Sequence, residues 1–153
     1  MLRLRADAGA MFWESDGGSL RIEFPAPHLA RVTFAGHLID EFVEPIAAAA
    51  ERLTQSGRPA VAFHDWEGMT NYDMSARLGM LGVAMRNHAK TARLHFLLGS
   101  TMVRLAVEVT NLVVGKFEVH PGRRSFEEAY ARAIAEIAAA ADGSRRLSRS
   151  PPG

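Results

Sequence analysis

The sequence predicts an α/β fold with a mixed, mostly parallel sheet, an N-terminal β-hairpin and four helices. Residues 10–36 alternate apolar and polar side chains around turn-forming Gly and Pro, which is typical of β-strands. From Asp40 onward apolar residues recur at helical spacing, and short apolar strands then alternate with helices. Strands separated by helices generally pair in parallel. The 153 residues are interpreted as a single domain at 1–141 and a disordered tail at 142–153.

The first part of the chain is predicted to form a β-meander. Residues 11–13 precede the turn cluster 15–19, and an alternating strand follows at 20–24. Residues 1–19 are therefore interpreted as an N-terminal extension with an added strand. Another strand is expected at 29–35, before a helix that starts near Asp40 and ends at Gly57.

Three more strands, each followed by a helix, are predicted at 60–63, 93–98 and 116–119. Asp73 is the expected N-cap of the helix after the first of them. The inward face of this helix is predicted to hold Met74, Leu78, Leu81 and Met85.

Ser100 or Thr101 should cap the next helix, with Gly115 just past its end. Its inward residues are predicted to be Met102, Leu105, Val109, Leu112 and Val113. An exposed strip on the other side, which would form a homodimer face, would consist of Val103, Val107 and Val114. The last helix is predicted to begin at a capping box, Ser125 to Glu128, and to end near Asp142-Gly143.

Composition narrows the possible classes of protein. Lys and Arg total 18 against 17 Asp and Glu, so no strong overall field favours nucleic acid or an anionic membrane. The chain has no cysteine, which excludes disulfides and thiol chemistry. No apolar stretch reaches the length of a membrane span. We expect a cytoplasmic protein without membrane insertion or nucleic-acid binding.

The stretch 61–82 is the strongest candidate for a functional site. A short strand ends at His64-Asp65, a polar loop is predicted at 65–74, and Ser75 lies in the first turn of the following helix. Free backbone N–H groups and the helix dipole favour a phosphate or a polar partner at such a position.

Three segments resemble the STAS domain of anti-sigma-factor antagonists, and in particular its divergent, bacterial SpoIIAA-like members. They are 31–38 (RVTFAGHL), 61–76 and 117–129 (FEVHPGRRSFEEA). In regulatory members of that family an anti-sigma kinase phosphorylates a serine in an Asp-Ser-Ser-Gly-like turn, and the complex dissociates. The resemblance places Ser75 at the phosphorylated position. Met74 and Ala76 replace the first serine and the glycine of the turn.

The resemblance implies a non-catalytic protein-interaction module in bacterial signalling, with a protein partner and a homodimer as candidate assemblies. The loop 65–74 and the exposed face of the next helix form the predicted docking surface. The residues predicted to contact a partner are Asp65, Glu67, Tyr72, Asp73, Ser75, Gly79, Gly82 and Arg86. Ser75 is also the candidate phosphorylation site.

Two other functions remain open from the sequence. Related folds can hold a small apolar or lipid-like ligand between sheet and helices. A hydrolase would need Ser75, His64 and Asp65 to converge, without the Gly-x-Ser-x-Gly turn that exposes a nucleophile. The six histidines do not occur at the spacings that place two metal ligands on one helix face, so neither a metal nor a cofactor is expected.

Overall fold

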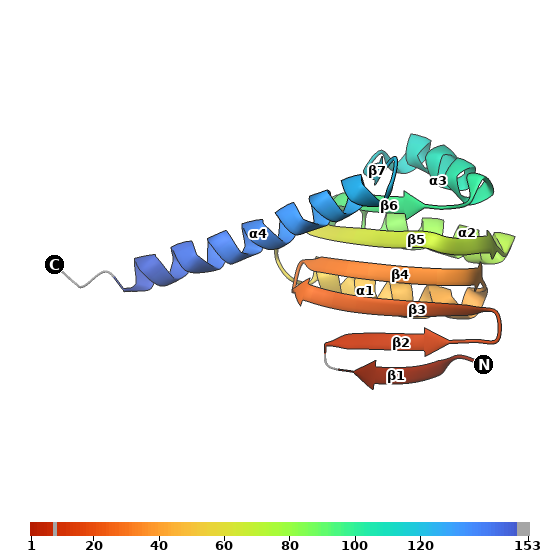
Figure 1. Ribbon diagram of the computed structural model, residues 1–153, viewed down its shortest axis with the longest axis horizontal. Coiled ribbons are helices and arrows are strands. Elements are labelled where there is room, and N and C mark those ends of the chain that lie inside the picture. The colour runs from red at the N-terminus through yellow and green to blue at the C-terminus, as the bar shows by residue number, and fades with distance from the viewer. Residues whose placement is uncertain (8, 150–153) are drawn as a thin grey trace.

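The computed structural model describes residues 1–7 and 9–149 and forms one seven-stranded sheet with helices on both faces (Figure 1). The strands lie in sequence order from β1 to β7. Pairing is antiparallel from β1 through β4 and parallel from β4 through β7. The strands are β1 Arg3–Asp7, β2 Ala10–Glu14, β3 Gly18–Ala26, β4 Leu29–Leu38, β5 Ala60–Tyr72, β6 Thr91–Leu98 and β7 Phe117–Val119. The mixed α/β fold predicted from the sequence is confirmed.

The helices are α1 Val43–Thr54, α2 Met74–Arg86, α3 Thr101–Val114 and α4 Arg123–Ser148, with short 3-10 turns at Asp40–Phe42 and His88–Lys90. Helices α1, α2 and α3 cover one face of the sheet, and α4 crosses the other (Figure 1). The α1–α3 face contains the larger apolar core, which includes Phe34, Phe42 and Phe96. The α4 face has a smaller one around Phe63 and Phe126.

The N-terminal extension contributes two strands, β1 and β2, where the sequence predicted one. They extend the antiparallel side of the sheet, with Trp13 of β2 opposite Leu20 of β3. Partial burial of Trp13 against the main core ties β2 to the domain.

The prediction of a polar loop at 65–74 is wrong, because β5 continues as a strand to Tyr72. It pairs in parallel with β4 as far as Leu38 opposite Tyr72, with two register shifts on the way. Gly68 allows this pairing: a Cβ there would lie 3.0 Å from the Cβ of Ala35. Backbone pairing with β4 therefore outweighs the polar composition of this segment.

The prediction of which residues of α2 and α3 point inward is also wrong. In α2 the buried residues are Ala76 and Val83, while Met74 and Leu78 are 59% and 60% exposed. In α3 the buried residues are Val103, Val107 and Val114, and the exposed large side chains are Met102, Leu105, Val109, Leu112 and Val113. In α2 the small residues Ala76 and Gly79 lie on the packed side, and a Cβ on Gly79 would lie 3.1 Å from Val43 Cγ1 of α1.

Helix α4 differs from its prediction at both ends. It begins at Arg123 after the N-cap Gly122, and the Ser125 hydroxyl contacts His120 instead of capping the helix. It continues through Gly143 to Ser148, so residues 142–148 of the predicted tail are helical, and residues 150–153 lie outside the described residues. The C-terminal half of α4 extends beyond the sheet (Figure 1). Among residues 1–7 and 9–149, no helix combines the length and apolar character needed to cross a membrane.

Candidate functional site

Strand β5 positions the predicted site residues on opposite faces of the sheet. Successive side chains of a strand point to opposite faces, so His64 and Trp66 pack toward α1–α3, whereas Phe63 and Asp65 lie on the α4 side. The segment that the sequence predicted as one docking loop is thus divided between two environments.

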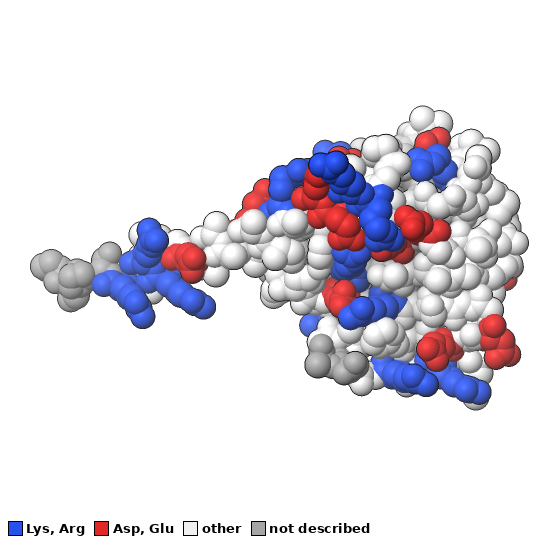
Figure 2. All heavy atoms as spheres, viewed as in Figure 1, with Lys and Arg blue, Asp and Glu red and all other residues white. Residues whose placement is uncertain are grey.

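Asp65 is buried, with 6% of its surface exposed, and lies between two arginines. Arg123 donates two hydrogen bonds to its carboxylate, at 2.9 and 3.0 Å, and Arg31 donates a third at 3.1 Å. Arg31 also donates two bonds to Glu127 of α4, at 2.9 and 2.6 Å. Figure 2 shows acidic and basic side chains side by side where the first turns of α4 cross the sheet.

This charge network shifts the pKa values of its members. Burial alone would raise the Asp65 pKa, but the hydrogen bonds and charges of Arg123 and Arg31 outweigh burial and lower it. The hydrogen bond from Arg31 likewise lowers the Glu127 pKa. Asp65 therefore ties β5 and β4 to α4, and it does not lie on the surface as the docking prediction required.

Ser75 is exposed at the start of α2, as expected, and its hydroxyl donates a 2.9 Å hydrogen bond to Asp40 Oδ2. Asp73 occupies the N-cap position, but its carboxylate contacts His37 Nε2 at 2.7 Å and makes no side-chain capping bond. Two carboxylates thus lie beside the candidate phosphorylation site, which makes its surroundings acidic.

The two glycines of α2 have different surroundings. A Cβ on Gly79 would lie 3.1 Å from Val43 Cγ1, so this glycine allows close packing against α1. A Cβ on Gly82 would meet only the guanidinium of the exposed Arg86, at 3.2 Å. Of the two, Gly82 is the one available to a partner.

The remaining predicted contact residues, Glu67 and Tyr72, lie in the middle and at the C-terminal end of β5. Glu67 is on the α4 side, where its carboxylate lies 3.6 Å from Arg123 Nε. Tyr72, at the last position of β5, has the Arg77 guanidinium 6.0 Å from its ring centre. Glu67 and Ser75 therefore do not belong to one continuous patch of a single face.

A cavity of about 120 Å³ lies between the sheet and α1–α3. Its lining is mostly apolar, but it includes His64 and Trp66, which are 7% and 6% exposed. Within residues 1–7 and 9–149, neither His64 Nδ1 nor Trp66 Nε1 has a hydrogen-bond partner. Burial, with a smaller effect of His95, lowers the His64 pKa to about 3, so this imidazole is neutral near pH 7. Buried polar atoms are normally paired, so these two nitrogens could accommodate the polar group of a small ligand.

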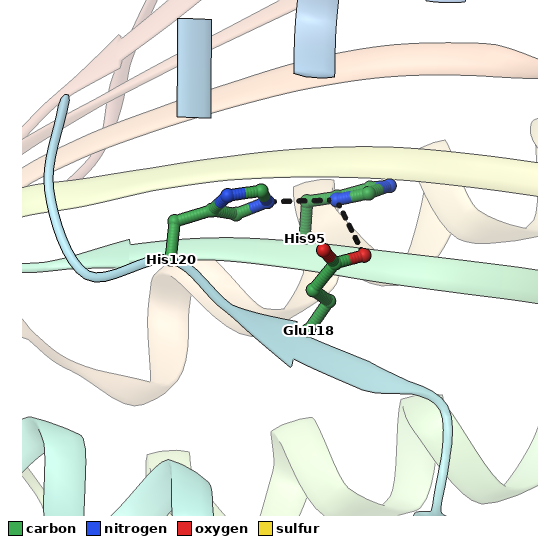
Figure 3. Close-up of side chains that lie close together, drawn as sticks. All are labelled: His95, Glu118 and His120. Carbon is green, nitrogen blue, oxygen red and sulfur yellow. Dashed lines mark hydrogen bonds and ion pairs between the residues drawn. The ribbon is translucent and has the colours of Figure 1, made fainter. Parts of the chain in front are cut away.

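A pair of histidines, His95 and His120, lies on the α4 side of the sheet (Figure 3). His95 Nδ1 is 2.9 Å from His120 Nε2 and 3.5 Å from Glu118 Oε2. Burial lowers the His95 pKa to about 4 despite the carboxylate of Glu118, and it also lowers the His120 pKa. The contact between these histidines could not be predicted from the sequence. They are separated by 25 residues and come together only because β6 pairs with β7.

The structure does not assemble the hydrolase arrangement. His64 lies in the α1–α3 core, Asp65 bonds to arginines on the other face, and Ser75 bonds to Asp40. None of these three side chains forms a hydrogen bond with another of the set. A triad needs its nucleophile, base and orienting acid within hydrogen-bond reach.

Solved structures with the same arrangement are proteins of the SpoIIAA type. The anti-sigma factor antagonist SpoIIAA in its unphosphorylated form is 19% identical, with a TM-score of 0.58, over 74% of this chain and 96% of that one. The Bacillus cell fate determinant SpoIIAA in its phosphorylated form is 20% identical, with a TM-score of 0.56, over 74% and 98%. An uncharacterized DUF3478-family protein with a SpoIIAA-like fold from Shewanella loihica PV-4 is 19% identical, with a TM-score of 0.56, over 75% and 96%.

The chain therefore has a SpoIIAA-like fold, and the resemblance predicted from the three sequence segments is confirmed at the level of fold. No protein-family model and no curated protein sequence matches it.

Proposed function

We propose that this chain is a non-catalytic, regulatory protein-interaction module of bacterial signalling. It docks a protein partner through the outer face of α2 and the adjoining end of β5. The observation that carries the proposal is the exposed apolar surface of α2: Met74, Leu78 and Met85 are 59%, 60% and 47% exposed. Apolar side chains gathered on one helix face are typical of a surface that a partner covers.

Four polar residues and one glycine border this surface and would set the orientation of the partner. They are Tyr72, Asp73, Ser75, Gly82 and Arg86, all of which were predicted as contact residues. Asp65 and Gly79 are left out because one is buried by arginines and the other packs on Val43. Glu67 lies on the α4 side, so it would contact a partner only at the edge of the docking surface.

Phosphorylation of Ser75 would act on the same surface. A phosphate adds about 1.5 to 2 negative charges, and here it would lie beside Asp40, which now accepts the Ser75 hydroxyl. The bond to Asp40 would be replaced by repulsion, and the start of α2 would move away from the Asp40–Phe42 turn. The Bacillus cell fate determinant SpoIIAA, whose fold this chain shares, has itself been solved in a phosphorylated form.

Affinity capture with purified full-length baits tests the docking surface. We expect Leu78→Gln to lose a partner that the wild-type chain captures. Leu147→Gln is the matched control, since Leu147 is an apolar residue with 80% exposure near the far end of α4, and it should retain that partner. Equal capture by the wild-type and Leu78→Gln baits would contradict docking through α2. Ser75→Asp and Ser75→Ala baits extend the test: loss with Ser75→Asp alone supports the switch, and identical capture rejects it.

A homodimer that forms through α3 is a second proposed assembly. The strip predicted for it, Val103, Val107 and Val114, is buried, so a dimer would use the exposed residues of α3, such as Leu105 and Leu112. Light scattering of the wild-type chain and of Leu112→Gln distinguishes a dimer from a monomer. The proposed cellular location is the cytoplasm.

The cavity on the α1–α3 side supports one alternative function, the binding of a small ligand. The ligand would have an apolar body and one hydrogen-bonding group that pairs with Trp66 Nε1–H and His64 Nδ1. Native mass spectrometry of freshly purified protein should then detect a bound small molecule, which would be absent from His64→Phe. A bare chain mass for the wild type, together with unchanged Trp fluorescence when hexanoic acid is added, would reject this alternative.

A further inference from the structure

The side chains of His95, Glu118 and His120 come together because of the strand register. Strands β6 and β7 pair in parallel with His95 directly opposite Glu118. The N–H of His120 continues the ladder by donating to the carbonyl oxygen of Phe96 at 2.9 Å. Since residues two apart on an extended chain point to the same face, Glu118 and His120 both lie beside His95. One ligating atom from each residue lies within 4.8 Å of the other two.

Neighbouring groups hold both imidazole rings in place. The Ser125 hydroxyl lies 2.7 Å from His120 Nδ1, which directs Nε2 toward His95, as Figure 3 shows for the two facing rings. The His95 ring stacks on Phe63 with centroids 4.1 Å apart and an angle of 2° between the planes. Hydrogen bonds from a second layer of residues to ligating histidines are typical of metal sites, where they fix the ring and its tautomer.

We propose that His95 Nδ1, His120 Nε2 and a Glu118 carboxylate oxygen bind a divalent transition-metal cation, with zinc as the best match. Two imidazoles and one carboxylate are a ligand set that zinc uses with a fourth position open to water or another ligand. Without the cation, one of the two facing nitrogens carries the proton of the hydrogen bond between the rings. When the cation binds, that ring changes tautomer, so its one proton moves to its own outer nitrogen. His120 Nδ1–H then donates to Ser125 Oγ, and the lone pair of His120 Nε2 is free for the metal.

The distances require only a small adjustment. Zinc–nitrogen bonds of about 2.0–2.1 Å at tetrahedral angles place two ligand nitrogens roughly 3.4 Å apart. The two ring nitrogens are 2.9 Å apart, so the rings must separate by about half an ångström. The distance of 3.5 Å between His95 and Glu118 already matches. Glu118 is 51% exposed at its side chain and can move toward the ion.

Charges of both signs surround the cluster and have opposite effects on cation binding. Glu118 contributes a negative charge, whereas Arg93 and Arg132 are near enough to act on the histidines as positive charges. The N-terminus of α4, which begins three residues beyond His120, adds a partial positive charge. These cationic groups weaken cation binding, so removal of Arg132 should increase the affinity that removal of Glu118 decreases.

Titration calorimetry of the untagged full-length chain with Zn²⁺, together with visible absorption after addition of Co²⁺, tests the site. We expect saturable binding by the wild type and unchanged binding by His28→Gln, a histidine in the turn between β3 and β4. Glu118→Gln should weaken binding by at least about tenfold, and Ser125→Ala by about 10- to 100-fold. Arg132→Gln should strengthen it.

Circular dichroism of each variant identifies any that fail to fold, and Glu118→Gln keeps the test decisive because its side chain is half exposed. Absence of Zn²⁺ and Co²⁺ binding by the wild type would overturn the proposal and leave a hydrogen bond between neutral histidines. Binding that is the same in the wild type, Glu118→Gln and His95→Gln would overturn it too, because the ion would then bind elsewhere.

Discussion

The two faces of the sheet differ in whether they provide hydrogen-bond partners for neighbouring buried residues of β5. On the α4 side, the Asp65 carboxylate accepts three hydrogen bonds from two arginines. On the α1–α3 side, the adjacent His64 is equally buried but its Nδ1 has no partner. A fully paired buried group stabilises the fold, whereas an unpaired one costs stability and is retained where it has another use. We infer that the Asp65 network on the α4 side stabilises the fold, and that the cavity beside His64 on the α1–α3 side is available for recognition.

Removal of one partner of the charge network should have the largest effect. Arg31→Met removes one hydrogen bond from Asp65 and two from Glu127, although Arg123 still contacts both carboxylates. The loss of these three charged hydrogen bonds should lower the free energy of unfolding by about 3 kcal/mol. Urea denaturation measures the change. Arg124→Met is the matched control, because its ion pair with Glu128 is exposed, with side chains 93% and 57% accessible. The control should change stability by less than about 0.5 kcal/mol. Equal losses in the two variants would contradict a structural role for the network.

Acid should destabilise the protein through His64. The folded protein binds a proton at His64 only near pH 3, whereas the free imidazole has a pKa of 6.5. As the pH falls from 6.5 toward 3, the unfolded chain takes up this proton and the folded chain does not, so stability decreases. The loss is about 1.4 kcal/mol per pH unit for this group. Urea denaturation between pH 7 and 4 should therefore give a shallower slope for His64→Phe.

His95 contributes acid sensitivity of the same sign, because its pKa is lowered to about 4. Some slope should thus remain in His64→Phe between pH 6.5 and 4. A wild-type protein whose stability does not change over this range would contradict the burial of both imidazoles in neutral form.

The two glycines of α2 provide a smaller comparison within one helix. Gly79→Gln forces a side chain against Val43 and should cost about 1–3 kcal/mol through overpacking. Gly82→Gln meets only a flexible guanidinium and gains helix propensity, so it should be neutral or stabilise by up to about 1 kcal/mol. Thermal unfolding of the two variants measures the difference. Equal destabilisation would place Gly82 against the body of the protein and remove it from the docking surface.

The order of strands and helices could be predicted from the sequence because it depends on local patterns. Apolar alternation located β3 and β4, and Gly115 and Ser100 marked the ends of α3. Which side of α2 and of α3 packs against the sheet could not be predicted in this way. Both helices carry apolar residues around much of their circumference, so periodicity alone does not select a face. Close packing against α1 and the sheet selects the smaller residues, such as Ala76 and Val83.

The site could be predicted only in part for a similar reason. Ser75 and Asp73 lie where the helix-start pattern placed them, since a helix N-terminus is a local feature. The burial of Asp65 depends on Arg31 and Arg123, which are 34 and 58 residues away in sequence. The cluster of His95, Glu118 and His120 likewise depends on strand register. Its one sequence signal is the spacing of two between Glu118, on a predicted strand, and His120, just after the end of that strand.

The most direct test compares two substitutions at adjacent residues of β5, Asp65→Asn and His64→Phe, by urea denaturation at pH 7. Asp65→Asn removes the charge that holds two arginines and should decrease the free energy of unfolding by about 2–3 kcal/mol. His64→Phe removes an unpaired buried nitrogen and should leave stability unchanged or raise it by about 1 kcal/mol. A clear loss in Asp65→Asn with no loss in His64→Phe is the result expected if the Asp65 network stabilises the fold and the His64 cavity does not. A similar loss in both variants would contradict this division between the two faces.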